Sequence, residues 1–516
     1  MKRVPTLVAA AMMALSLPAF SLTQYTTDLV IVGSGTAGLP AAATAAQMGV
    51  KAITIEKSPT IGGQLHVIEG TYAVGTDIQR KEMIGLNAEK SFDQTMKYAA
   101  WRADPQLVKR IIEASGPNIK WMMDTGVAMK GVMTDTLDGN RVYHTYAGHY
   151  PGEQAVGALM KVIREKGGKV LTEMKGEHLI IDKDGTVTGV VAKNLKTGEE
   201  VRIHAKAVLL AAGSMANGPD MMAKYNPSLR VAGKPMKSIA IETNTGDGIK
   251  MGLEAGADLR NTDIVISESI VPTNTLYLEQ YVDKKMLDAY MMLKAQTLWV
   301  NTAGHRFMDE SHSDDFTIVF NAIHNQGNQA FVIMDDAKRV DLMQGAGSDT
   351  NYFTVYDKGQ KVVHFDEVVA DGQKRGYAFK ANTIPELAKL MGVNPTVLQA
   401  TVDRYNKMAR AGVDTDFGKK HNLIPIVKAP FYAFKGDGTI CDMTGGLLIN
   451  SKAQVMDKKG NPIKGLYAAG SMAGGMYGTE YPYINPGFAS ATAIATGRFA
   501  VQDASELANS SGLAGT

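Results

Sequence analysis

The sequence contains very little cysteine, since Cys441 is the only one among 516 residues. A single thiol excludes an intrachain disulfide, a cysteine-based metal cage and a Cys-x-x-Cys-His haem attachment site. A charge surplus is also absent, because 54 Lys and Arg residues stand against 52 Asp and Glu residues, a net charge of +2. This balance argues against a dedicated nucleic-acid binder, which carries a basic surplus or stripe. With 45% hydrophobic and 21% charged residues, the chain is expected to be a globular protein of two or three domains.

Long apolar runs are absent apart from one at the N-terminus. A basic Met-Lys-Arg start precedes an apolar run over residues 4–20 and the small residue Ser21. This order is typical of a Sec-type signal peptide. An uncleaved membrane anchor is the alternative, but the run is at the short limit for a bilayer span and no stop-transfer charges follow it. We therefore expect residues 1–21 to be a signal peptide cleaved near Ser21, and the mature protein to be periplasmic.

The strongest motif follows this segment directly. The β-branched run Asp28–Val32 predicts a buried strand, and Gly33-Ser-Gly35-Thr-Ala-Gly38 comes next. Residues 39–48 predict a helix, and residues 51–55 predict a second strand that ends at Glu56. The pattern G-x-G-x-x-G is a weak signal alone, but it is strong within a strand–helix–strand unit that ends in an acid. The segment therefore predicts a dinucleotide-binding fold.

Each residue type in this unit has a physical role. Gly33 permits the tight turn, Gly35 lets the backbone approach a pyrophosphate, and Gly38 allows close packing of helix and strand. The helix N-terminus faces the phosphates, and Glu56 can bind an adenosine ribose hydroxyl.

Later segments favour FAD over NAD as the dinucleotide. Lys57 is followed by the pair Gly62-Gly63 and by Gln64, and residues 207–214 predict a strand that ends in small residues. Residues 463–471 are another such segment that ends in small residues. Distant segments that return to one nucleotide site are typical of FAD folds.

The remaining motifs carry a family resemblance. Residues 245–257 contain G-D-G followed by A-G-A, and residues 300–310 follow V-N-x-x-G-x-R-F-x-x-E. Residues 444–446 and 465–470 are two late glycine-rich segments. With these motifs, essentially the whole mature chain resembles the FAD-binding flavoprotein subunits of fumarate reductase and succinate dehydrogenase. It is most similar to their soluble secreted branch, which includes flavocytochrome fumarate reductases, urocanate reductases and 3-ketosteroid dehydrogenases.

The resemblance implies an α/β fold in which a Rossmann-like FAD-binding domain carries an inserted α+β capping domain. Residues 25–270 and 442–510 would form the FAD-binding domain, and residues 271–441 would form the cap over the flavin. The FAD is expected to be non-covalent, because the loop at 62–64 lacks the histidine run of the membrane-complex enzymes. The residues expected to contact FAD are Gly33, Gly35, Thr36, Ala37, Gly38, Glu56, Lys57, Gly62, Gly63, Gln64, Ala212, Gly213, Asp247, Gly470, Ser471 and Ser490.

Several catalytic residues of the fumarate reductases have no counterpart here. Reduction of a polarised C=C bond needs a hydride, a proton donor and groups that stabilise negative charge. The position of the cap arginine that donates the proton falls on Asp314, and that of a carboxylate-binding histidine falls near Asp442. The proton-relay Glu and Arg fall near Tyr290 and Leu293, and a second carboxylate-binding arginine is missing. Arg306 is retained, but its role in the family is structural. The sequence therefore argues against fumarate and against any dicarboxylate clamp.

A tyrosine-rich stretch, residues 477–487, stands in place of the carboxylate site. It is similar to the Y-P-x-x-G stretch of 3-ketosteroid dehydrogenases, with a two-residue insertion. That resemblance implies that the Tyr481 hydroxyl and the Gly487 N–H hold a substrate carbonyl oxygen. Tyr483 is a competing candidate because of the insertion, and the alternative is that these tyrosines only pack against the flavin.

Other residues are weaker candidates. His312 and Asp314 are possible proton donors in the cap. Tyr146 and His149 belong to an aromatic and histidine cluster that either contacts substrate or forms a loop over the FAD. Asp442 is a candidate for substrate binding. No residue set predicts a metal site.

The electrons are expected to come from a separate protein, because the chain has no haem motif, iron–sulfur cysteine set or second dinucleotide fingerprint. A c-type cytochrome or an FMN-bearing protein would fit a periplasmic setting. The leading hypothesis is a periplasmic FAD-dependent reductase of the C=C bond of an α,β-unsaturated carbonyl compound, an enoate or enone, that serves anaerobic respiration. The alternatives are a 3-ketosteroid-type dehydrogenase and a non-catalytic flavin-binding protein. No nucleic-acid partner and no membrane span are expected for the mature protein.

Overall fold

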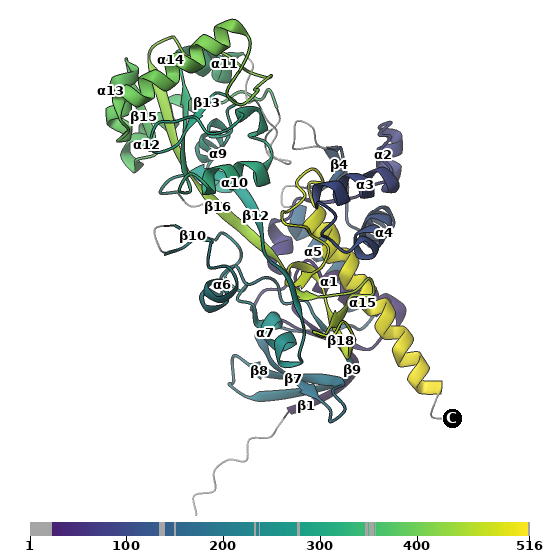
Figure 1. The fold of residues 1–516 in the computed structure, drawn as a ribbon. Helices are drawn as coiled ribbons and strands as arrows, with labels where there is room; N and C mark the ends of the chain where they lie inside the picture. Colours follow the sequence, from purple (N-terminus) through teal and green to yellow (C-terminus); the bar gives the residue numbers. More distant parts are fainter. Residues whose placement is uncertain are drawn as a thin grey trace, which may run out of the picture.

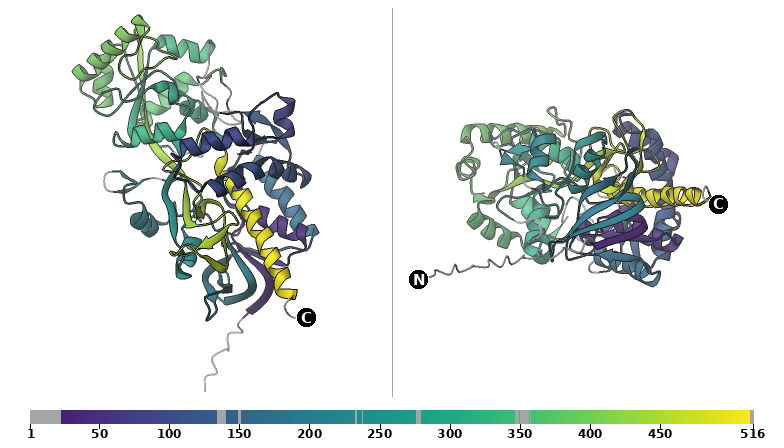
Figure 2. Two further views of the ribbon diagram at one scale, coloured as in Figure 1. Left: turned by 45° about the vertical axis from the view of Figure 1, so that its right-hand side comes forward. Right: turned by 90° about the horizontal axis from the view of Figure 1, so that it is seen from below.

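The computed structural model describes residues 23–133, 140–148, 151–231, 234–236, 238–275, 279–345, 349, 356 and 358–513. The chain forms two parts joined by a long pair of antiparallel strands, β12 and β16 (Figure 1). Figure 2 shows the same two parts from two further sides. Among the described helices, none combines the length and apolarity needed to cross a bilayer.

The lower part in Figure 1 is built on a largely parallel sheet with the strand order β17-β18-β9-β1-β2-β6. β1 pairs in parallel with both β2 and β9, as the predicted dinucleotide fold requires. An antiparallel pair, β7 and β8, extends the sheet from β9. The strands are β1 (Thr23–Val32), β2 (Ala52–Ile55), β6 (Lys169–Leu171), β7 (Met174–Ile181), β8 (Val187–Asn194), β9 (Glu200–Leu210), β17 (Gln454–Met456) and β18 (Pro462–Ala468).

Helix α1 (Gly38–Met48) follows β1 and packs against α5 and α15. Its small residues allow this close packing, and Gly49 ends it in the left-handed conformation that glycine adopts without strain. A small sheet with the order β3-β5-β4 lies beyond α1. The elements of this region are α2 (Asp77–Lys81), α3 (Ala88–Tyr98), α4 (Pro105–Asp124), α5 (Pro151–Glu165), α6 (Pro219–Tyr225), α7 (Asp247–Glu254), α15 (Phe488–Leu513), η1 (Gly63–Val67), η3 (Gly470–Met472), β3 (Gly70–Tyr72), β4 (Met129–Met133), β5 (Tyr143–Tyr146), β10 (Arg230–Val231) and β11 (Lys234–Pro235).

The upper part is the cap, an α+β unit around a second sheet with the order β12-β16-β14-β13. β15 and β19 also pair with β16. Its elements are β12 (Leu259–Pro272), β13 (Leu298–Val300), β14 (Gln329–Met334), β15 (Ala378–Ala381), β16 (Phe431–Leu448), β19 (Ala473–Gly474), α8 (Glu279–Val282), α9 (Lys284–Met292), η2 (Glu310–His312), α10 (Phe316–His324), α11 (Asp336–Gln344), α12 (Phe365–Arg375), α13 (Ile384–Met391) and α14 (Pro395–Ala411). The predicted α/β fold with an inserted α+β cap is confirmed.

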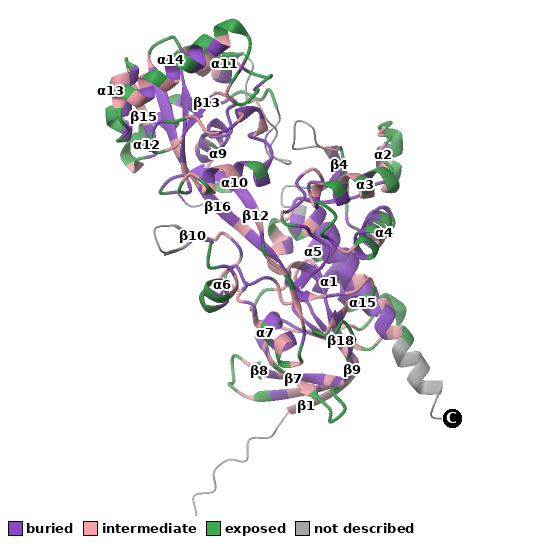
Figure 3. Ribbon diagram, viewed as in Figure 1, coloured by how far each residue is buried: buried purple, intermediate pink, exposed green. Residues whose placement is uncertain are grey.

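The predicted boundaries at 270/271 and 441/442 fall inside β12 and β16, so the two parts share continuous strands instead of linkers. Figure 3 shows α1, β16 and the cap half of β12 as largely buried, whereas α13 and α14 carry exposed residues. The hydrophobic core accordingly continues from the lower part into the base of the cap.

A buried ion network stabilises the cap. The Arg306 guanidinium donates to Glu310 at 2.8 Å and pairs with Asp414 at 2.8 Å. Lys419 Nζ lies 3.2 Å from the Glu310 carboxylate, and both side chains are fully buried. Removal of one partner would leave a buried charge without compensation, which is strongly destabilising. Arg306 therefore has the structural position that the family resemblance implies.

Candidate functional site

The glycine-rich turn after β1 opens onto a cavity of the lower part. Gly33 has a φ of +105°, and a Cβ atom there would clash with the carbonyl oxygen of Ala211. A Cβ atom on Gly38 would clash with the carbonyl oxygen of Gly33. At Gly35 the nearest atom to a Cβ would be Gly62 O at 3.9 Å, so this backbone faces open space. The turn thus forms a cradle that a side chain at Gly35 would fill.

The cavity lies at the carboxyl ends of the parallel strands. It is lined by these predicted FAD contacts: Gly33, Gly35, Thr36, Ala37, Glu56, Lys57, Gly63, Gln64, Ala212, Gly213, Asp247, Gly470 and Ser471. Gly38 and Gly62 support the turn behind this wall, and the Ser490 hydroxyl instead donates to the carbonyl oxygens of Gly70 and Gly487.

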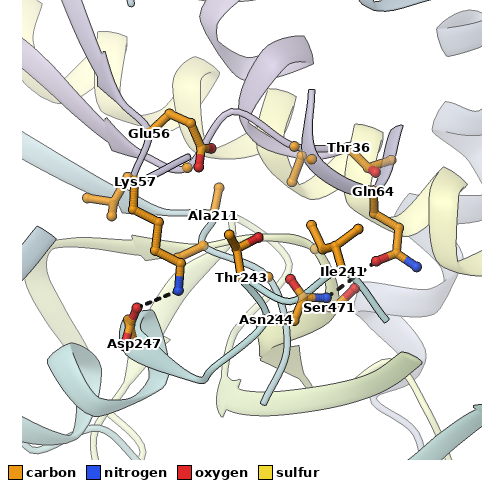
Figure 4. Close-up of a pocket in the computed structure, with 18 of the residues that line it drawn as sticks. Thr36, Glu56, Lys57, Gln64, Ala211, Ile241, Thr243, Asn244, Asp247 and Ser471 are labelled. Carbon is orange, nitrogen blue, oxygen red and sulfur yellow. Dashed lines mark hydrogen bonds and ion pairs between the residues drawn. The ribbon is translucent and has the colours of Figure 1, made fainter. Parts of the chain in front are cut away.

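Glu56 and Lys57 form one end of the cavity (Figure 4). Ser34 N and Oγ each donate to Glu56 Oε2 at 2.9 Å, and Ser58 N donates to Oε1 at 2.8 Å. Lys57 Nζ donates to Asp247 at 2.8 Å. Burial alone would raise the pKa of Asp247, but its hydrogen bond and ion pair with Lys57 hold the pKa below the ordinary value. This end therefore presents fixed acceptors suited to a ribose.

Gln64, Asn244 and Ser471 lie at the opposite end (Figure 4). Asn244 Nδ2 lies 3.4 Å from Gln64 Oε1 and 3.2 Å from Asp442 Oδ1. Asp442 lines the cavity beside them, and its pKa is raised to about 6 because burial disfavours the charged form. Sequence reasoning placed Asp442 near substrate, and the structure places it on the wall of the dinucleotide cavity.

Sequence reasoning missed part of the cavity lining. Ile241, Thr243 and Asn244 come from an irregular loop before α7, and Met174–Gly176 come from the start of β7. Neither segment carries a recurring motif.

The tyrosine-rich stretch lies between the start of α15 and the cap helix α10. Tyr481 is 4% exposed, and its hydroxyl oxygen accepts a hydrogen bond from Ala489 N at 3.1 Å in the first turn of α15. Burial raises the pKa of Tyr481, and the backbone N–H groups of Ala489 and Phe488 oppose that rise. At neutral pH the hydroxyl is therefore protonated and can donate to a ligand.

Tyr483 and the cap complete this aromatic cluster. The Tyr483 ring stacks on Phe316 of α10 with centroids 4.7 Å apart, and the Tyr481 ring lies 6.2 Å from both Tyr483 and Tyr477. Thr317 Oγ1 donates to the carbonyl oxygen of Tyr481 at 3.1 Å. These contacts hold the stretch against the first turn of α10.

The predicted proton donors lie just before α10. Asp314 is buried, whereas the His312 side chain is 41% exposed and lies 3.9 Å from Asp309. Asp315 caps α10 by accepting from Ile318 N at 2.9 Å, and burial raises its pKa. The fold thus brings residues 312–315 and the tyrosine-rich stretch to the same side of the cap.

The remaining predicted substrate contacts lie elsewhere. Tyr146 is buried on β5, with its hydroxyl 4.0 Å from Met122 Sδ, and it does not line the cavity. Gly487 has a φ of +80°, and its carbonyl oxygen accepts from Tyr72 N. His149 lies outside the described residues. Within the same predicted cluster, His144 bonds Thr76 Oγ1 at 2.7 Å, and burial lowers its pKa to about 4.

Comparison with known proteins agrees with this geometry. The profile of the family described as FAD binding domain matches residues 28–482. The chain is 31% identical to the vinyl phenol reductase of Lactiplantibacillus plantarum, over 91% of this chain and 94% of that protein. It is 30% identical to the urocanate reductase of Eggerthella lenta, over 88% of this chain and 71% of that protein.

Solved structures show the same fold. A flavocytochrome c3 fumarate reductase in an open conformation superposes with a TM-score of 0.69 at 28% identity, over 93% of this chain and 78% of that chain. A 3-ketosteroid-Δ4-(5α)-dehydrogenase from Rhodococcus jostii has a TM-score of 0.74 at 24% identity, over 95% and 98% of the two chains.

The protein belongs to the FAD binding domain family and is a flavin-dependent oxidoreductase with FAD as its cofactor. The described residues fit FAD: the Gly35 cradle leaves room for a pyrophosphate, and the Glu56 carboxylate is fixed where a ribose would lie. The opposite end of the cavity, at Asn244 and Asp442, is then left for the isoalloxazine.

Proposed function

We propose that the protein reduces the C=C bond of an α,β-unsaturated carbonyl compound, an enone or enoate. The observation that carries this proposal is the placement of the Tyr481 hydroxyl, buried among aromatic rings and hydrogen-bonded to the first turn of α15. The similar proteins named as reductases of vinyl phenol, urocanate and fumarate support a reaction at a C=C bond.

We assign the residues of the site the following roles in this reaction. FAD, held by the Gly35 turn and Glu56, would supply a hydride for the carbon β to the carbonyl. The Tyr481 hydroxyl donates a hydrogen bond to the carbonyl oxygen, where negative charge develops in the transition state. The N–H of Ala489 and the N-terminus of α15 stabilise that hydroxyl as a donor. A proton to the α carbon, from Asp314, His312 or Tyr483, completes the addition of two electrons and two protons.

The same geometry disfavours a dicarboxylate substrate. Asp442 stands where a carboxylate-binding histidine is expected from the resemblance, and an acid there supplies no cation to pair with a second carboxylate. Lys294 is a buried cation near the tyrosine-rich stretch, and its Nζ donates to Ser269 Oγ at 2.9 Å and lies 3.6 Å from the centroid of the Phe316 ring. Lys294 is the residue to examine if an acid proves to be the substrate.

The cellular setting is part of the proposal. Residues 1–21 would direct the chain to the periplasm, where FAD would be held without a covalent bond. A c-type cytochrome or an FMN-bearing protein would deliver electrons, and the enzyme would act as a terminal reductase in anaerobic respiration. Efficient turnover of the purified protein with NADH, or its recovery from the cytoplasm with residues 1–21 intact, would overturn this part.

The reaction is tested with the purified FAD-loaded protein and a reduced viologen dye under anaerobic conditions. The substrate panel pairs unsaturated acids (fumarate, urocanate and cinnamates) with enones and unsaturated lactones. Dye oxidation by a member of the panel other than fumarate, with formation of the saturated product, supports the proposal. Absence of turnover with every member, in a protein with full flavin content, would favour a flavin-binding protein without this activity.

A further inference from the structure

Asp442 is the acidic side chain at the Asn244 end of the FAD cavity. Its carboxylate accepts from Ser214 Oγ at 2.5 Å, from its neighbour Met443 N at 2.9 Å, and from Asn244 Nδ2 and Ser471 Oγ at 3.2 Å each. All of these partners are donors, and none carries a positive charge. Asp442 is only 5% exposed, so its charged form is held by neutral dipoles in a buried position.

The charged and titratable groups around Asp442 do not neutralise it. On its own strand, Cys441 has a raised pKa because of burial and the nearby carboxylates of Glu268 and Asp442. From the tyrosine-rich stretch, Tyr477 has a pKa raised to about 12, mainly by burial and in part by the Asp442 charge. On η1, the His66 ring bonds Ile61 O at 2.6 Å, and on the loop that carries Asn244, Glu242 is exposed.

The cations of the cavity lie at its other end. Lys57 and Lys175 both face Asp247, at 2.8 Å and 4.0 Å. With the adenosine ribose held at the Glu56 end, the Asp442 end would face the part of FAD that accepts electrons. Two electrons that enter there add negative charge beside a buried carboxylate without a cationic partner among the lining residues described. Repulsion between like charges then favours protonation of the carboxylate.

We infer that Asp442 is a proton-storing group of the flavin site: it takes up one proton when two electrons enter the cofactor and releases it when they leave. The cofactor itself takes two electrons and one proton, and Asp442 takes the second proton from water. The loaded site then holds the two electrons and two protons that convert a C=C bond into CH–CH. This inference needs FAD at the site and holds for any substrate.

The test is a spectroscopic redox titration of the FAD-loaded protein from pH 5 to 9, without substrate. Above about pH 6, where the Asp442 carboxylate ionises in the oxidised protein, the midpoint potential of the wild type is expected to fall more steeply than that of Asp442→Asn. One additional proton per two electrons corresponds to about 30 mV per pH unit. The matched control is Glu242→Gln, which removes an exposed acid from the same loop as Asn244 and should keep the wild-type slope.

A second variant tests the proton-storing role of Asp442 if Asp442→Asn does not retain flavin. Ser214→Ala removes a donor to the carboxylate, which raises the pKa of Asp442 and moves the steep part of the curve to higher pH. Equal slopes in wild type and Asp442→Asn, or an unshifted curve in Ser214→Ala, would overturn the inference. Because no substrate is present, failure here is distinct from failure of the proposed reaction.

Discussion

Replacement of Tyr481 by phenylalanine removes one hydroxyl and keeps the ring that packs against Tyr477 and Tyr483. In the structure this hydroxyl accepts from Ala489 N at 3.1 Å, and in the proposed reaction it donates to a substrate carbonyl. Loss of the acceptor leaves a partly buried N–H in the first turn of α15 without this partner, which costs at most about 1–3 kcal/mol of the free energy of unfolding. Loss of the donor removes charge stabilisation in the transition state, with an effect on kcat on the order of a hundredfold.

The two effects are separable in one set of assays. Anaerobic dye oxidation gives kcat at a temperature well below the unfolding transition, flavin absorbance gives the FAD content, and denaturant titration gives the stability. Tyr481→Phe is expected to keep its flavin and lose most of its kcat. Tyr483→Phe is the comparison variant, because it removes the hydroxyl of the competing candidate while its ring would still stack on Phe316.

A kcat of Tyr481→Phe within about threefold of wild type, against the hundredfold expected for a lost donor, would refute the reasoning. If the loss occurs in Tyr483→Phe instead, the polarising hydroxyl is two residues further along the chain. In either case the stability loss of Tyr481→Phe would still report its bond to α15.

Two further predictions follow from the turn and from β5. Gly35→Ala should fold but bind FAD at least about tenfold more weakly, a loss of about 1.4 kcal/mol, because the new Cβ enters the cavity. Gly38→Ala should fail to fold, because its Cβ meets Gly33 O. Flavin titration of the apoproteins and circular dichroism check this pair, and normal FAD affinity in Gly35→Ala would contradict the prediction. His144 is fully buried and has a folded-state pKa of about 4. The unfolded chain therefore binds more protons between about pH 6.5 and 4. The free energy of unfolding should fall by up to about 3 kcal/mol as the pH falls through that window. Denaturant titrations across that range should show a shallower pH dependence for His144→Gln, and an unchanged pH dependence would contradict the assignment.

Local patterns predicted the dinucleotide unit well, because its geometry depends on neighbours in the sequence. The helix expected over residues 39–48 is α1, and the strand expected over 51–55 is β2. β1 begins at Thr23 instead of Asp28, because its first half pairs with β9, nearly 180 residues away, as in the pair Thr23 and Val201. Such long-range pairing leaves no signal in a short window of sequence.

The surroundings of the tyrosine-rich stretch and of Asp442 were less predictable for the same reason. The hydrogen bond from Ala489 N to the Tyr481 hydroxyl depends on how the stretch folds back onto α15, which no local motif encodes. Asp442 has a different environment from the one the resemblance suggested, because Ser214, Asn244 and Ser471 converge on it from three separate segments. The part of the loop before α7 that lines the cavity has irregular backbone, so neither helical nor strand periodicity identified it.

The central claim is that this site polarises a carbonyl and does not clamp a carboxylate. The most direct measurement is the ratio of kcat/KM for a matched pair of substrates, 4-phenylbut-3-en-2-one and cinnamate, with reduced viologen as the electron donor. The two share a skeleton and differ in a ketone against a carboxylate. We expect kcat/KM for the ketone to exceed kcat/KM for the acid by about tenfold or more. An equal or greater kcat/KM for cinnamate, or rapid turnover of fumarate, would contradict it.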